Sequence, residues 1–304
     1  MSVEGQSSPQ GLGPVRRFSE IDSTNRYLAD EARAGAPHGL VAVAEYQTAG
    51  RGRLGRRWDA PPGANLLFSV LLYPFADQDR GRDPDRARDP GHRSIDPVVS
   101  HLCSICVALA AADSCKQLAG VDPGLKWPND LVVDDLKLAG VLAEVIGGTA
   151  NGAALVVGLG LNVGWPPKHP AESERPAAPE ESPGSGREVL QTATSLARLS
   201  DVAVDPAMLL AGLLDNLGRR LTELHGTEGR QLHGPAHVAV MDEYRSRCVT
   251  LGRHVRVDQS SGSFHGVAVE VTDEGHLVVE SPSGRRVVMA GDVVHLRHEV
   301  ETGR

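Results

Sequence analysis

Residues 126–162 read KWPNDLVVDDLKLAGVLAEVIGGTANGAALVVGLGLN, and this stretch decides the fold class. It holds three apolar runs of strand length, at residues 131–133, 138–146 and 153–161. The pairs Asp134-Asp135 and Gly147-Gly148 separate the runs, and both pairs are typical of turns. Because apolar runs bounded by such pairs are typical of strands, the stretch predicts three successive strands.

The rest of the first 247 residues mixes helix and strand signals without regular alternation. Asp96 and Pro97 form an N-cap and first turn for a long helix, whose apolar residues are spaced four and three apart and which ends at Gly120. Further helices are predicted from Ser23 or Thr24 to Ala34, from Asp205-Pro206 onward and over residues 238–247, and further strands over residues 41–45 and 66–73. These signals predict an α+β fold with a mixed sheet and helices.

The pattern changes from Cys248 onward. Valines alternate with polar residues there, and turns such as Asp273-Glu274-Gly275 separate the runs. This texture predicts a small all-β barrel of about 50 residues. We therefore expect two domains, residues 1–247 and residues 248–304.

The composition narrows the classes of protein to which the chain can belong. Hydrophobic residues make up 40% of the 304 residues and charged residues 23%, which excludes a disordered or fibrous chain. The net charge of −8 argues against a general nucleic-acid binder. No signal peptide is apparent, and the longest apolar stretch, residues 153–163, is too short to cross a bilayer. The protein is therefore expected to be cytoplasmic.

Two segments, residues 76–97 and 166–187, are polar and rich in proline, and are predicted to be insertions or linkers that are mobile. Cys103 and Cys106 form a CxxC pair within the long apolar helix, with no second pair at ligand spacing. They are predicted to be core thiols, not zinc ligands.

The sequence QTAGRGRLGRRW at residues 47–58 places four arginines and three glycines directly after a predicted strand. Residues 50–55 match a dinucleotide-binding fingerprint, but Asp59-Ala60-Pro61-Pro62 cannot form the helix that this fingerprint needs. The remaining interpretation is a flexible loop that closes over an anionic ligand, because each Arg offers planar donors to carboxylate or phosphate. A solvated basic loop is the alternative.

Only four of the 31 Lys and Arg residues are lysines, and two of these, Lys126 and Lys137, lie in apolar stretches. Lys126 begins KWPND, which combines a cation, an aromatic ring, an amide and a carboxylate at a turn. Lys137 begins KLAG, whose Gly140 allows a ligand to approach closely. A further motif, GLGLN at residues 158–162, ends a strand with small residues and an amide. Taken singly, each motif is explained by turn or strand structure.

Taken in order, Ser23-Thr24-Asn25, the arginine-rich segment and these three motifs resemble the biotin protein ligases. The match covers residues 18–164 and resumes in the C-terminal β region. The resemblance implies a fold related to class II aminoacyl-tRNA synthetases, followed by an SH3-like barrel. It also implies a reaction in which biotin and Mg-ATP give biotinyl-5′-adenylate, and a lysine of a biotin carboxyl carrier domain then takes the biotin.

The resemblance also implies roles for individual residues. Arg53 and Lys137 are the expected catalytic cations. The residues expected to bind biotin are Ser23, Thr24, Asn25, Gln47, Arg51, Gly52, Arg53, Lys137 and Gly140. Those expected to bind ATP or the adenylate are Arg51, Arg53, Arg56, Trp58, Lys126, Trp127, Asn129, Asp130 and Asn162. Asp130 is also the candidate ligand of Mg²⁺.

Two other functions are weighed against this one. A lipoate–protein ligase shares the fold and the adenylation chemistry, but is not expected to combine the Gly-Arg-Gly-Arg loop with KWPND. A non-enzymatic nucleic-acid module is disfavoured by the net charge of −8 and by the lack of aromatics among the arginines. Only 22 residues precede Ser23, too few for the DNA-binding domain of some family members. The expected partners are biotin, ATP and the carrier domain of an acyl-CoA carboxylase, without nucleic acid or membrane, and the chain is expected to be a monomer or a weak homodimer.

Overall fold

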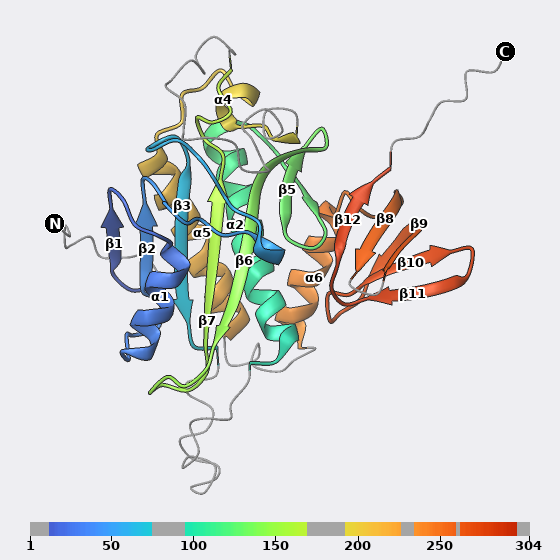
Figure 1. Ribbon diagram of the computed structural model, residues 1–304, viewed down its shortest axis with the longest axis horizontal. Coiled ribbons are helices and arrows are strands. Elements are labelled where there is room, and N and C mark those ends of the chain that lie inside the picture. Colours follow the sequence, from blue (N-terminus) through green and yellow to red (C-terminus); the bar gives the residue numbers. More distant parts are fainter. Residues whose placement is uncertain (1–11, 75–94, 169–191, 226–233, 260–261, 297–304) are drawn as a thin grey trace, which may run out of the picture.

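The computed structural model describes residues 12–74, 95–168, 192–225, 234–259 and 262–296, and a seven-stranded sheet forms its centre (Figure 1). The strand order is β1-β2-β3-β7-β6-β5-β4, with only β1 and β2 parallel. The strands are β1 (Val15–Phe18), β2 (Val41–Ala44), β3 (Leu66–Leu72), β4 (Gly124–Lys126), β5 (Asp130–Val133), β6 (Leu136–Ile146) and β7 (Ala154–Leu161). The three strands predicted from residues 126–162 are thus confirmed as β5, β6 and β7.

Helices cover both faces of this sheet (Figure 1). In β3, Phe68 and Val70 belong to the core under α2 (Pro97–Ala119), whereas Leu71 belongs to the core under α1 (Thr24–Arg33). Because alternate residues of a strand point to opposite faces, a fully apolar strand is buried on both sides. Two further helices, α5 (Pro206–His225) and α6 (Pro235–Arg247), pack against α2, and the short α4 (Leu196–Leu199) lies beyond one end of the sheet.

Helix α2 has the ends that the sequence predicts. Asp96 accepts a hydrogen bond from the Val98 amide at 2.8 Å, and Gly120 ends the helix with a φ of 68°. By length and composition alone this helix could cross a membrane, although it holds no uninterrupted apolar run as long as that in residues 153–163. Its most apolar window is 72% buried, as befits a helix packed between the sheet and α5. Cys103 and Cys106 are fully buried in it and are core thiols, as predicted.

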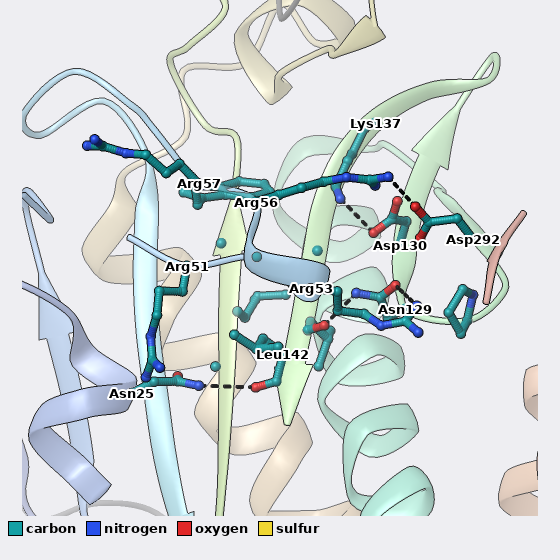
Figure 2. A pocket seen from close by; sticks show the side chains of 18 of the residues that line it. Asn25, Arg51, Arg53, Arg56, Arg57, Asn129, Asp130, Lys137, Leu142 and Asp292 are labelled. Atoms are coloured by element: carbon teal, nitrogen blue, oxygen red, sulfur yellow. Dashed lines mark hydrogen bonds and ion pairs between the residues drawn. The ribbon is translucent and has the colours of Figure 1, made fainter. Parts of the chain in front are cut away.

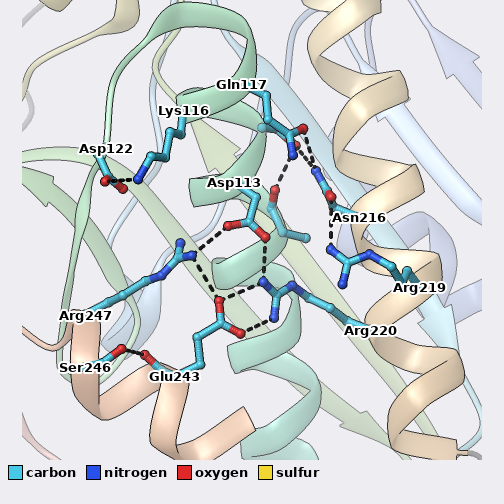
Figure 3. A network of polar contacts seen from close by, with 12 residues as sticks. Asp113, Lys116, Gln117, Asp122, Asn216, Arg219, Arg220, Glu243, Ser246 and Arg247 are labelled. Carbon is cyan, nitrogen blue, oxygen red and sulfur yellow. Dashed lines mark hydrogen bonds and ion pairs between the residues drawn. The ribbon is translucent and has the colours of Figure 1, made fainter. Parts of the chain in front are cut away.

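A network of charged side chains joins α2, α5 and α6 (Figure 3). Arg220 of α5 donates to Asp113 of α2 at 2.5 Å and to Glu243 of α6 at 2.7 Å, and its side chain is only 7% exposed. Arg247, the last residue of α6, donates to the same Asp113 at 2.9 Å. Each guanidinium therefore meets carboxylates from a neighbouring helix, which fixes how the three helices pack.

The C-terminal segment forms a second, antiparallel sheet of five strands in the order β11-β10-β9-β8-β12. These are β8 (His254–Gln259), β9 (Gly262–Val271), β10 (Leu277–Ser281), β11 (Gly284–Val288) and β12 (Asp292–His295). This confirms the predicted small all-β unit. The unit docks on the first sheet, since Val249 donates its amide to Leu125 at 3.0 Å and Trp127 donates Nε1 to the Gly275 carbonyl at 2.9 Å.

Several boundaries differ from the sequence-based expectations. Strands β1 and β4 were not expected, and α6 begins at Pro235, earlier than residue 238. Most of the two predicted insertions, residues 76–94 and 169–187, lie outside the described residues. Ile95 is buried and leads into α2, so the first insertion ends earlier than predicted. The division of the chain after Arg247, where α6 ends, stays a prediction.

Candidate active site

A cavity of about 350 Å³ lies over β6 and β7 (Figure 2), and three glycines of these strands, Gly140, Gly158 and Gly160, help to line its floor. Gly140 of β6 and Gly160 of β7 are cross-strand partners. A Cβ atom at Gly160 would lie 2.4 Å from Cε2 of Trp58, and one at Gly158 would lie 2.1 Å from Oδ1 of Asn25. Only a residue without a side chain permits contacts this close. The GLGLN motif therefore provides a flat floor on which other side chains rest.

Neutral polar groups gather at one end of this cavity, where α1 begins. Ser23 caps α1, and Thr24 donates to Oε1 of Gln47 through its amide at 2.7 Å and its hydroxyl at 3.0 Å. Asn25 donates through Nδ2 to the Glu144 carboxylate at 2.7 Å. Ser23, Thr24 and Asn25 are buried, and Thr24 and Asn25 already have hydrogen-bond partners, so their orientation is fixed before a ligand arrives.

Residues 50–57, which we name the arginine loop, cross the cavity. Near the tip, Leu54 has a φ of 56° in the left-handed region, which costs a residue with a side chain about 1–2 kcal/mol. Side-chain contacts offset this cost. Arg51 donates to Glu144 at 2.9 Å, and Arg53 donates to Oδ1 of Asn129 at 3.2 Å. The loop therefore lies against the sheet with Arg51 and Arg53 turned towards it, whereas Arg57 points away (Figure 2).

Cations and a carboxylate meet at the other end of the cavity. Lys137 Nζ lies 2.7 Å from Asp130 Oδ1 and 5.5 Å from the centre of the Trp58 ring. Burial lowers the pKa of Lys126 and of Arg53, and the Asp130 carboxylate opposes that shift in both. Cations that have lost solvent gain most from an added anion. This end is where a carboxylate or phosphate would be held.

Comparisons with known proteins lead to one family. A family model described as "Biotin/lipoate A/B protein ligase family" matches residues 18–162, and one described as "Biotin protein ligase C terminal domain" matches residues 250–296. A relative from Mycobacterium tuberculosis, named Biotin--[acetyl-CoA-carboxylase] ligase, is 35% identical over 286 residues, which cover 92% of this chain and 88% of the relative. The chain belongs to the biotin protein ligase family.

Other proteins are also similar to this ligase over most of its length. The Biotin--[acetyl-CoA-carboxylase] ligase of Paracoccus denitrificans is 26% identical over 276 residues. The matched region covers 91% of this chain and 98% of that relative. The solved structure of the Aquifex aeolicus biotin protein ligase in complex with biotin and ATP superposes with a TM-score of 0.66. It is 22% identical and covers 93% of this chain and 98% of that one, which shows that the two share a fold.

All but one of the site residues predicted from the sequence line the same cavity of this biotin protein ligase. They are Ser23, Thr24, Asn25, Gln47, Arg51, Gly52, Arg53, Arg56, Trp58, Lys126, Trp127, Asn129, Asp130, Lys137 and Gly140. Trp127 is only 2% exposed, so it serves mainly as a wall under the KWPND turn. The assignment of each residue to biotin or to ATP stays a prediction.

Asn162 is the exception, because the structure does not place it among the residues that line the cavity. Its amide nitrogen donates to the Thr194 carbonyl at 3.0 Å, and its oxygen accepts from Asn65 at 2.8 Å. The residue is 5% exposed. In this arrangement Asn162 joins β7 to the segment before α4, and its contact with ATP stays a prediction.

Sequence reasoning missed several residues that line the cavity. Ser69 donates its hydroxyl to Oδ1 of Asn25 at 2.6 Å, and its signal was a lone hydroxyl in the apolar strand LLFSVLL. Arg256, Asp258 and Asp292 of the C-terminal sheet also line the cavity. They had no local signal, because charged residues on the strands of a small barrel usually face solvent.

Proposed function

We propose that this ligase joins biotin to ATP as biotinyl-5′-adenylate, with release of pyrophosphate, and then transfers biotin to a lysine of a biotin carboxyl carrier domain of an acetyl-CoA carboxylase. The observation that carries the proposal is a single cavity with a neutral polar end, a glycine floor and a cationic end. The printed name of the Mycobacterium tuberculosis relative supports the acceptor, and the ligands of the Aquifex aeolicus structure support the substrates.

The neutral end of the cavity suits the ureido ring of biotin. That ring carries two N–H donors and one carbonyl acceptor but no charge. Buried hydroxyls and amides can therefore recognise it without leaving a buried charge unpaired. Thr24 and Asn25 supply buried groups of this kind, and Gln47 supplies a half-buried amide. Trp58, which rests on the glycine floor, supplies an apolar cover for the ring system and the alkyl chain.

The cationic end suits the reaction itself. The biotin carboxylate attacks the α-phosphate of ATP, so the protein needs no nucleophile of its own. It must instead bring two anions together and stabilise the charge that develops between them. Lys137 of the cationic end is expected to contact both groups, and Arg53 to neutralise the phosphate from the loop. Arg51 pairs with Glu144 beside Asn25, at the neutral end. A closed arginine loop would also keep water from the adenylate, which is a reactive mixed anhydride.

In the second step the neutral amine of the acceptor lysine attacks the acyl carbon of the adenylate, AMP leaves with the electron pair of the broken C–O bond, and the nitrogen gives up a proton to solvent as the amide forms. The same cations stabilise this leaving phosphate, because its charge develops where Lys137 and Arg53 already lie. One set of side chains therefore serves both steps.

Magnesium is expected to accompany ATP, and the residues present fit it. The Asp130 carboxylate lines the cationic end, and Mg²⁺ typically takes one or two carboxylates together with substrate phosphates. When bound, the ion supplies further neutralisation of the phosphate charge. Asp130 would hold the ion, and its contact with Lys137 keeps the carboxylate at the edge of the reaction site.

The test follows the two half-reactions separately. The protein is incubated with biotin and Mg-ATP, and pyrophosphate release is measured with and without biotin. A carrier domain is then added, and mass spectrometry locates the modified lysine. Biotin-dependent pyrophosphate release and one biotinylated lysine are expected. Pyrophosphate release that depends on lipoate and not on biotin would assign the chain to lipoate ligation instead.

Three further expectations belong to this proposal. The protein acts in the cytoplasm, binds no nucleic acid, and is a monomer or a weak homodimer. The net charge of −8 supports the second expectation, because such a surface repels phosphates. Light scattering at several protein concentrations tests the oligomeric state, and a mobility shift with duplex DNA at low salt tests the lack of nucleic-acid binding.

A further inference from the structure

The arginine loop is attached to two different parts of the molecule. Arg51 and Arg53 contact Glu144 and Asn129, which lie on and beside the first sheet. Arg56 instead forms an ion pair with Asp292, 236 residues further along the chain, at the start of β12 in the C-terminal sheet (Figure 2). The second sheet therefore holds one side of the loop that covers the cavity.

The charged neighbours of Asp292 in the C-terminal sheet favour its contact with Arg56. In the register of β12 and β8, Asp292 lies opposite Asp258, a second carboxylate. Arg256 donates to Asp258 at 3.0 Å and offsets that charge, which leaves Asp292 to Arg56. The Asp292 side chain is 20% exposed and that of Arg56 is 69% exposed. A partly buried carboxylate thus holds an exposed arginine.

The contact reaches beyond Arg56, because Arg53 and Arg56 lie in one turn of the loop. The Arg56 amide donates to the Arg53 carbonyl at 3.2 Å, so the two residues move together. Leu54 lies between them in a left-handed conformation, which the loop keeps only while its contacts hold. Holding Arg56 on β12 therefore also holds Arg53 over the cationic end of the cavity.

We propose that Asp292 is a positioning residue, which holds the arginine loop closed through Arg56 and so sets how long the adenylate is retained. The proposal rests on the proposed function. Asp292 also lines the cavity, and its charge acts on Arg53 as well as on Arg56. As a positioning residue it is expected to act mainly through Arg56. The opposite role is that Asp292 competes with phosphate for Arg56, in which case its removal would tighten ATP binding.

The first test compares Asp292→Asn with the wild type. Biotinyl-adenylate is formed on the enzyme from labelled biotin and Mg-ATP, and its release is followed after a chase with unlabelled adenylate. Because exposed ion pairs are weak, we expect release to become up to about fivefold faster. Salt should accelerate wild-type release towards the rate of the variant, whose own rate should depend less on salt. Trypsin should also cut the loop of the variant faster, with unchanged melting temperature.

A matched control removes an ion pair of the same sheet that does not touch the loop. Glu270→Gln breaks the exposed pair between Glu270 of β9 and Arg285 of β11. This variant should release the adenylate at the wild-type rate. An equal acceleration in both variants would mean that the sheet is merely loosened, and would overturn the proposal.

A double-mutant cycle tests whether Asp292 acts through Arg56. The cycle compares Asp292→Asn, Arg56→Gln and the double variant. If the two residues act on each other, the double variant should release the adenylate no faster than the single variant with the faster release. Additive effects, unchanged release from Asp292→Asn, or a lower KM for ATP in that variant would each overturn the proposal. If the wild type forms no adenylate, the proposed function fails as well, and pyrophosphate release measured beforehand tells the two failures apart.

Discussion

Lys137 shows how much one side chain is expected to contribute. Its ammonium lies 2.7 Å from Asp130 and over the glycine floor, where the proposed function expects it to contact both reacting anions. Each charge-assisted hydrogen bond lost is worth about 1.5–3 kcal/mol, so Lys137→Ala should slow adenylate formation at least ten- to hundredfold. Biotin-dependent pyrophosphate release measures this. Lys116→Ala is the control, because Lys116 pairs with Asp122 on the surface. Near-normal pyrophosphate release by a folded Lys137→Ala protein would contradict the catalytic role expected of Lys137.

Gly160 supplies a second test at the scale of one residue. A methyl group there would meet the Trp58 ring at 2.4 Å, so Gly160→Ala should displace the ring from the floor. Overpacking of this kind costs about 1–3 kcal/mol, and we expect biotin affinity, measured by calorimetry, to fall about tenfold or more. Gly147→Ala is the matched control, since a Cβ atom at Gly147 meets nothing within 4 Å. Equal affinities for the two variants would contradict the role given to the floor.

At the scale of elements, the charge network of α2, α5 and α6 makes stability depend on pH (Figure 3). Burial opposes ionisation of Asp113, but hydrogen bonds from Arg220 and Arg247 outweigh it and lower the pKa. A carboxyl with a lowered folded pKa stabilises the protein above its unfolded pKa of about 3.9, and this contribution is lost as the pH falls below that value. Asp113→Asn should cost about 1.5–3 kcal/mol in urea unfolding at pH 7.

The same experiment carries its own controls. The penalty of Asp113→Asn should shrink as the pH falls below about 4, because the carboxyl of the unfolded chain then takes up a proton, and that of the folded protein follows at its lower pKa. Asp122→Asn removes a carboxylate whose side chain is 53% exposed, and should change the free energy of unfolding by less than about 1 kcal/mol. A penalty for Asp113→Asn that does not vary between pH 7 and pH 3 would show that charge is not its cause.

The elements differ in how well the sequence predicts them, and the reason is physical. Helix α2 was predicted at both ends because Asp96 and Gly120 are local capping signals that do not depend on the rest of the fold. Strands β1 and β4 are only four and three residues long, and owe their conformation to pairing with β2 and β5. Pairing with a distant partner leaves no periodicity in so short a segment.

At the scale of the whole molecule, the residues of the site also differ in how well the sequence predicts them. The motifs on and beside the first sheet can be recognised in the sequence by unusual features, such as Lys137 in an apolar strand or the four arginines of the arginine loop. Asn162 carries the same kind of signal, yet the fold uses its amide to hold two segments together. Asp292 carries no signal, because only the docking of the second sheet brings it to the loop. Local patterns therefore predict the chemistry better than they predict the assembly.

The docking of the two sheets is itself open to test at Gly275. This residue has a φ of 82°, and a Cβ atom there would lie 1.9 Å from Cδ2 of His101 on α2. Its carbonyl also accepts the Trp127 hydrogen bond under the KWPND turn. Gly275→Ala should therefore push the second sheet away from α2 and disturb the cavity, raising the KM for ATP and lowering the melting temperature.

Gly252→Ala separates this effect from backbone strain. Gly252 has a φ of 77°, close to that of Gly275, but a Cβ atom there meets nothing within 4 Å. Both variants should lose about 1–2 kcal/mol from the left-handed backbone, measured by urea unfolding. Only Gly275→Ala should lose about 1–3 kcal/mol more from the clash and slow biotin-dependent pyrophosphate release. If the two variants lose the same stability and keep the same activity, the second sheet does not support the site through this turn, and the cavity would depend on the first sheet and its arginine loop alone.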